Sequence, residues 1–202
     1  MGLSYSYEII TPARDVGTAL RKLRELAPRP DRRPPITVTL PGGDRVVVPY
    51  TSGFRSEPVD CSAGGTLELD TSLMFGVDDA VREYMEDRDP EADELGRVPI
   101  GYIYLTVRFA PAEHPRYASL EFMAATTGMS RLFARSPGVR AVFTGLAAES
   151  GGVCCLFDTE TEILDVCWLD GRPVQETVPG PRFANYRALA ATWSGQGPVA
   201  KP

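Results

Sequence analysis

Apolar and polar residues alternate in several short segments of the chain, and this period of two is typical of strands with one buried face. Leu3, Tyr5, Tyr7 and Ile9 show it near the start. The same pattern, with short apolar runs, predicts eight strands at residues 3–10, 36–40, 45–49, 65–75, 100–109, 117–124, 153–158 and 163–168. The glycines at 42–43 supply the positive φ angles of a tight hairpin turn between two of these strands.

Other segments repeat apolar residues every three or four positions, which is typical of amphipathic helices. Val16, Leu20 and Leu23 follow this spacing ahead of the helix-ending Pro28. The pattern predicts about four helical regions, of which three are residues 12–27, 77–88 and 182–193. The remaining region begins with a short helix at 131, starts a second helix at 136 and ends at the glycines 151–152.

The predicted strands follow one another in pairs, and the helices do not alternate strictly with them. This order favours an α+β fold, a mostly antiparallel sheet built from hairpins with the helices packed on it. No glycine-rich turn joins a strand to a helix, so a dinucleotide-binding fold is not expected. We expect one domain over 1–193, or two sub-halves, 1–76 and 97–193, joined by an acidic segment, 77–96. Residues 194–202 are expected to be a disordered tail.

Charge is concentrated in one part of the chain. The whole chain has a net charge of −6, and residues 77–95 contain nine acidic residues but two arginines. Residues 21–33 are basic instead. These runs are interpreted as solvated faces, as a surface that steers a basic partner, or as patches that meet within one molecule or between subunits. The negative net charge and the short basic run disfavour nucleic-acid binding.

The composition, 43% apolar and 24% charged, is that of an ordinary folded domain. No apolar run approaches the ~18 residues of a membrane span, and residues 1–7 lack the features of a secretory signal. Arginine greatly outnumbers lysine, as in proteins from GC-rich bacterial genomes. We expect a bacterial cytoplasmic protein, not bound to membranes, with its four cysteines reduced.

Motifs for catalysis, metal binding or cofactor binding are not found in the sequence. We therefore expect no metal and no cofactor, and lean against an enzyme. His114 is the only histidine. It lies in a loop beside Glu113, where we expect it to be exposed to solvent. His114, Glu113 and Asp165 are weak catalytic candidates.

The last predicted hairpin brings cysteines together. A turn centred on residues 160–161 places Cys154 opposite Cys167 and Leu156 opposite Asp165. Two thiols and the nearby carboxylates would then share the face of the hairpin turned away from the core. That arrangement suits a redox pair or a soft metal, but the favoured interpretation is that the small cysteines pack under another element.

Two surfaces are candidates for binding. Asp87, Glu91, Asp93 and Glu94 lie in the acidic helix-loop. Four tyrosines on two strands would form an aromatic sheet face if the strands were neighbours, and tyrosine is favoured at interfaces; they are Tyr5, Tyr7, Tyr102 and Tyr104. The leading hypothesis is a non-catalytic interaction domain that uses one of these surfaces for a basic protein partner or for self-association. The alternative is a small-molecule-binding domain or enzyme with a cleft between sheet and helices.

Overall fold

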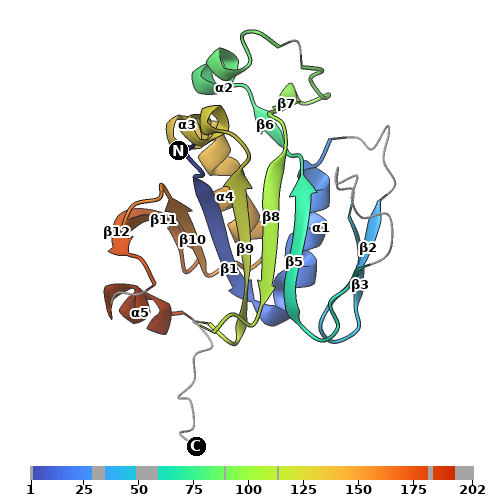
Figure 1. Cartoon of the computed structure of the whole chain (residues 1–202), viewed down its shortest axis with the longest axis vertical. Coiled ribbons are helices and arrows are strands. Elements are labelled where there is room, and N and C mark those ends of the chain that lie inside the picture. The colour runs from blue at the N-terminus through green and yellow to red at the C-terminus, as the bar shows by residue number, and fades with distance from the viewer. Residues whose placement is uncertain are drawn as a thin grey trace, which may run out of the picture.

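The computed structural model describes residues 2–28, 35–48, 59–88, 90–112, 114–181 and 184–193. In these residues the chain forms a seven-stranded antiparallel sheet, two smaller sheets and five α-helices (Figure 1). The α+β class and the mostly antiparallel pairing predicted from the sequence are therefore confirmed. The expected tail, residues 194–202, lies outside the described residues.

The large sheet has the strand order β12-β11-β10-β1-β9-β8-β5, and each neighbouring pair is antiparallel. Strands from both sides of the acidic segment share this sheet, and β1 lies between β10 and β9. The strand bounds are Ser6–Pro12 (β1), Gly65–Thr71 (β5), Ile103–Phe109 (β8), Tyr117–Ala124 (β9), Cys154–Asp158 (β10), Ile163–Leu169 (β11) and Arg172–Pro179 (β12).

The two smaller sheets flank the large one. The first contains β2 (Ile36–Thr39), β3 (Arg45–Val48) and β4 (Val59–Asp60), and the second pairs β6 (Met74–Gly76) with β7 (Arg97–Pro99). The hairpin predicted at 42–43 is confirmed, because both glycines have positive φ angles of 95° and 91° between β2 and β3. The single strand expected at 65–75 is instead divided between β5 and β6.

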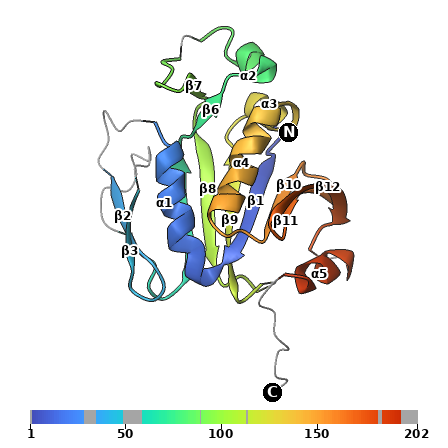
Figure 2. The same cartoon turned by 180° about the vertical axis from the view of Figure 1, so that it is seen from behind.

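Helices α1 (Val16–Leu26) and α4 (Pro137–Glu149) lie side by side on one face of the large sheet (Figure 2). A 3-10 turn, Ala13–Asp15, leads into α1. Helices α2 (Asp79–Tyr84) and α3 (Thr127–Arg135) lie near one end of that face, and α5 (Ala184–Ala191) lies beside β12. Helix α2 is shorter than the predicted 77–88. Helix α3 begins before the predicted position 131, because the Thr126 hydroxyl caps it by accepting the Met129 N–H at 3.2 Å.

The main core lies between the sheet and helices α1 and α4. Tyr7 stacks on Phe143 and Phe157 with ring centroids 4.5 and 4.6 Å apart. A second, smaller core lies on the opposite face under α5, where Trp193 packs against Tyr117. The second face is thus covered by a described helix at one corner only (Figure 1).

The predicted register of the last hairpin is wrong. Cys154 lies opposite Leu169, and Leu156 lies opposite Val166. Five residues separate the paired Asp158 and Leu164, and a bulge shifts the register again between Cys155 and Leu156. Each irregularity shifts the pairing by one residue. A shift of one residue in register places a side chain on the other face of the strand. The thiol that lies close to Cys167 is therefore that of Cys155 and not that of Cys154.

Candidate functional site

The large sheet has a polar surface on the side away from α1 and α4. Strand residues alternate between the two faces, so each inward apolar residue has outward neighbours. Leu67, Leu69, Leu105 and Val107 point into the main core. We call the opposite surface the open face, formed by Ser6, Glu8, Glu68, Asp70, Tyr104, Thr106, Arg108, Ser119, Glu121, Met123 and Asp158.

Strand pairing places the acidic residues of the open face in rows across the sheet. Glu8 lies opposite Glu121, Glu121 lies opposite Thr106, and Thr106 lies opposite Glu68. The adjacent row has Asp158 and Asp70 at its two ends. Among these described side chains, five carboxyl groups face a single guanidinium.

Arg108 and two hydroxyl groups organise the centre of the open face. Arg108 Nη2 donates to Glu121 Oε2 at 2.6 Å, and the Ser119 hydroxyl donates to Glu8 Oε1. Burial, together with the charges of Glu121 and Asp158, raises the pKa of Glu8, although Ser119 and Arg108 oppose the shift. Burial and the charge of Glu121 also raise the pKa of Asp158. A cation placed beside Glu8 or Asp158 would oppose this rise in pKa, because it favours the ionised carboxylate.

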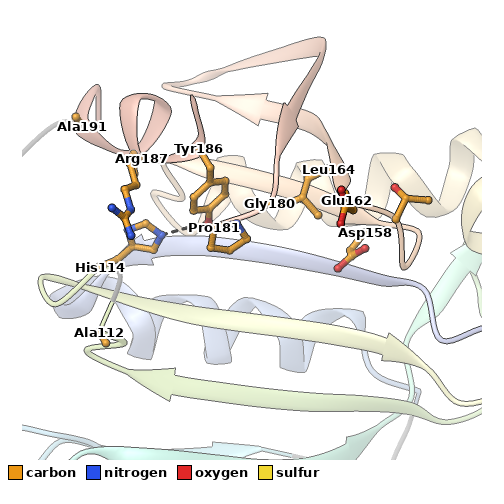
Figure 3. Close-up of a pocket in the computed structure, with 12 residues that line it drawn as sticks. Ala112, His114, Asp158, Glu162, Leu164, Gly180, Pro181, Tyr186, Arg187 and Ala191 are labelled. Carbon is orange, nitrogen blue, oxygen red and sulfur yellow. Dashed lines mark hydrogen bonds between the residues drawn. The ribbon is translucent and has the colours of Figure 1, made fainter. Parts of the chain in front are cut away.

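A hollow of about 840 Å³ lies beside the open face, between the sheet and α5 (Figure 3). Asp158 and Glu162 line one end, and His114, Tyr186 and Arg187 line the other. Asp158 belongs to both the hollow and the open face, so the two surfaces are continuous. The hollow combines a cation, an imidazole and carboxylates around a mixed polar and apolar wall.

The expectation that His114 is exposed to solvent is wrong. His114 is only 4% exposed, and its Nε2 lies 3.2 Å from the Tyr186 hydroxyl. Its ring centroid lies 4.4 Å from that of Trp193. The sequence could not reveal this environment, because Tyr186 and Trp193 lie far along the chain, in α5 and just beyond it. Glu113, its neighbour in sequence, lies outside the described residues.

Several acidic residues of the predicted acidic helix-loop are engaged in local structure. Asp78 caps α2 by accepting the Val81 N–H at 2.8 Å, and it also accepts the Ser136 hydroxyl at 2.6 Å. Glu83 pairs with Arg135. Asp93 accepts N–H groups of Leu95 and Arg97 and pairs with the Arg97 side chain.

These contacts lower the pKa of Asp78, where hydrogen bonds outweigh burial, and of Glu83, where Arg135 is the cause. Asp87, Glu91 and Glu94 have exposed side chains, and Asp89 lies outside the described residues. Glu91, Asp93 and Glu94 also border a hollow of about 380 Å³ that includes Met74 and Pro99.

The four tyrosines do not form one aromatic surface, because β9 separates β1 from β8. Tyr7 is buried in the main core, where burial raises its pKa, and Tyr5 packs against the same core. Tyr102 and Tyr104 are 52% and 47% exposed, and Tyr104 belongs to the open face. Sequence alternation alone could not determine which face of each strand the helices cover.

Asp165 lies with the thiols on the helix-covered side of the sheet, far from the open face in the fold. It pairs with Phe157 across the hairpin, and its Oδ2 is 3.8 Å from Arg140 Nη2 on α4. Among the described residues, no cluster of histidine, cysteine, aspartate and glutamate is suited to hold a metal ion. Nor does any helix in the described ranges have the length and apolar character needed to cross a membrane.

No family model and no curated protein matches the chain. Among solved structures, it is similar to a chain in the crystal structure of the toxic C-terminal tip of CdiA from Pseudomonas aeruginosa in complex with immune protein. The similarity covers 86% of this chain and 98% of the other, with 12% identity and a TM-score of 0.38. A similarity of this size does not identify a function.

Proposed function

We propose that this chain is a cytoplasmic interaction domain that binds a basic protein segment on its open face. The proposal is carried by one observation: helices α1 and α4 cover the centre of one face of the sheet, and the described helices leave a carboxylate-rich surface on the other, outside the corner under α5. Sheets with one solvated face usually show scattered polar residues of both signs there. Here carboxyl groups outnumber the guanidinium, and Tyr104 lies next to Asp70 in the row that joins Asp158 to Asp70.

The chemistry of the open face suits lysine and arginine side chains. Carboxylates accept charge-assisted hydrogen bonds from both, and complementary charge speeds encounter between partners. Tyr104 and Tyr102 add apolar area with few rotatable bonds, which suits the centre of an interface. The same surface repels the phosphates of nucleic acid.

Glu8 couples this binding to pH. A cation seated beside Glu8 favours its ionised form, so binding would release a proton where the raised pKa keeps Glu8 protonated. Affinity for a basic partner should therefore increase as pH rises through the pKa of Glu8. The Glu8→Gln variant should lose that part of the pH dependence.

The test compares two variants that remove the same charge from different surfaces. The open-face variant carries Glu68→Gln, Asp70→Asn and Asp158→Asn. The matched control changes three exposed carboxylates of the acidic helix-loop, Glu86→Gln, Asp87→Asn and Glu91→Gln. Each protein is used to capture partners from the cytosol of the native cells, and captured proteins are quantified by mass spectrometry.

We expect a basic partner that the wild type and the control retain and the open-face variant loses. Loss only with the control would move the binding site to the acidic helix-loop, the other surface predicted from the sequence. Equal retention by both variants would contradict a charge-based interface. Sedimentation of the purified chain separates self-association from binding to a different protein.

A second candidate function rests on the hollow beside α5. Its volume of about 840 Å³ is that of a small-molecule pocket, and Arg187 with His114 would suit a carboxylate or phosphate group. Ligands of the native state raise the melting temperature. A thermal-shift screen of anionic metabolites should then give hits that Arg187→Gln abolishes, and a flat screen would remove this candidate.

A further inference from the structure

A polar cluster lies within the helix-covered side of the sheet, where β10 and β11 meet α4. Arg140 of α4 extends its guanidinium to the sheet, with Nη2 3.1 Å from Cys167 Sγ and 3.8 Å from Asp165 Oδ2. Cys155 of β10 lies beside the same thiol, whereas the Tyr7 hydroxyl of β1 donates to the Phe133 carbonyl oxygen at 3.1 Å. The Arg140 side chain is 35% exposed, so its guanidinium reaches the buried Cys167 thiol from the edge of the core and keeps contact with solvent.

The position of Cys167 follows from a β-bulge. The register shifts between Val166 and Trp168 in the pairing with β12, and the pairing with β10 passes from Val166 to Trp168 without including Cys167. Cys167 is thus the extra residue of the bulged strand. Bulges redirect a side chain, and they are frequent beside functional sites. Here the bulge brings the Cys167 thiol into hydrogen-bond contact with Cys155.

The two thiols have opposite acidities. The hydrogen bond from Cys155 and the Arg140 guanidinium lower the pKa of Cys167 against the effect of burial. The same hydrogen bond, together with burial, raises the pKa of Cys155. Cys154, on the other face of β10, also has a raised pKa because it is buried. The surroundings therefore favour ionisation at Cys167 and oppose it at Cys155 and Cys154.

The reactive sulfur borders a hollow of about 440 Å³ at the surface. Arg140, Ala141 and Thr144 line it from α4, and β12 contributes Pro173, Val174 and Gln175, none of which titrates. Cys167 is itself only 2% exposed. The hollow therefore gives a molecule as small as a peroxide a route toward the sulfur.

We propose that Cys167 and Cys155 form a redox-active dithiol that reduces a hydroperoxide and closes to a disulfide. The Cys167 thiolate attacks one peroxide oxygen, forming an S–O bond as the O–O bond breaks. The departing oxygen takes a proton and leaves as water or alcohol. The Cys155 sulfur then attacks the Cys167 sulfenic acid, forming the S–S bond, while the S–O bond breaks and the hydroxyl leaves as water with the Cys155 proton. The peroxide gains the two electrons that the thiols lose.

This site is separate from the open face, because it lies on the opposite side of the sheet. Arg140 has two acceptors there, Cys167 and Asp165. Once the thiolate charge is consumed, Asp165 remains to pair with the guanidinium. The oxidised pair thus leaves no isolated buried charge, which makes the step compatible with the folded state.

The test treats the native protein with hydrogen peroxide, then denatures it, alkylates the remaining thiols and measures intact mass. The wild type should lose two thiols, at Cys155 and Cys167, and keep Cys61 and Cys154. Cys155→Ser should stop at a sulfenic acid on Cys167 that dimedone traps. Cys167→Ser should lose no thiol on the same time scale, and Cys154→Ser, the matched control, should behave as the wild type.

The rate of Cys167 oxidation tests whether this sulfur reacts as a thiolate. Oxidation of Cys167 should be at least about tenfold faster than oxidation of Cys154. A thiol whose pKa is one unit lower has about ten times more thiolate at a pH below both pKa values. Its pH profile should reach half its maximum below the ~8.5 of an ordinary cysteine. Arg140→Gln should slow the reaction and shift the profile upward, and Arg140→Lys should restore part of the rate. Equal oxidation of all four cysteines, or oxidation of the pair only under denaturing conditions, would overturn the proposal.

Discussion

The helix-covered face and the open face of the large sheet are built by alternate residues of the same strands, yet they are filled in opposite ways. On the covered face, Tyr7, Phe122 and Phe143 pack ring against ring. On the open face, the same strands carry carboxyl groups, from the mostly buried Glu8 and Glu121 to the exposed Glu68. The difference indicates that the first face holds the fold together, and that the second is free to serve binding.

The largest expected difference between the faces is in stability. Phe143 contacts the rings of Tyr7, Phe75, Phe122 and Phe133. Phe143→Ala should therefore lower the free energy of unfolding by about 3–5 kcal/mol. Tyr104→Ala removes a ring of similar size from the open face and should cost less than about 1 kcal/mol. Urea denaturation measures both, and equal losses would mean that the open face is also part of the core.

A smaller effect is expected at the corner where α5 covers the second face. Trp193 packs against His114 and Tyr117 there. Removing a core tryptophan side chain typically costs ~3–5 kcal/mol, but α5 contacts the sheet mainly at its edge, so local detachment should limit the loss to about 2 kcal/mol. Hydrogen exchange of Trp193→Ala should rise in α5 and the 110–117 loop. Uniformly faster exchange throughout the sheet would show instead that both cores unfold together.

The smallest effect is expected at Glu8 and has the opposite sign. Because the pKa of Glu8 is raised in the folded state, the folded protein binds the proton more tightly than the unfolded chain. The wild type thus loses stability as pH rises from about 4.3, the ordinary glutamate value, to the raised one. Glu8→Gln removes this loss, because the amide does not ionise.

Thermal melts of the wild type and Glu8→Gln between pH 4 and pH 8 measure the effect. The variant should match the wild type at pH 4 and melt higher at neutral pH. A difference that does not change with pH would show that the carboxyl group acts through packing and not through its ionisation.

The sequence was most informative where local chemistry decides the structure. The glycines at 42–43 correctly predicted a hairpin, and the predicted helical restart at 136 agrees with α4, which begins at Pro137 with Ser136 as its cap. Strand β12 was missed, because Arg172, Gln175, Glu176 and Thr177 lie exposed on an edge strand and show no apolar alternation.

The candidate sites depended on long-range pairing and were less predictable. Glu8 and Glu121 were not identified, although each is a single acid between apolar residues of a strand, and that pattern could have marked them. Their pairing joins residues that lie more than a hundred positions apart. The cysteine pair was predicted with the wrong partner, because a bulge at Cys167 cannot be read from alternation.

Site-specific photo-cross-linking in living cells tests most directly whether the open face is the binding surface. A benzoylphenylalanine at position 104 reports on the open face, and one at position 95, where Leu95 is 76% exposed, reports on the acidic helix-loop. We predict that irradiation joins a basic protein to the chain from position 104 and not from position 95. An adduct from position 95 alone, or equal adducts from both positions, would contradict the open face as the site of interaction.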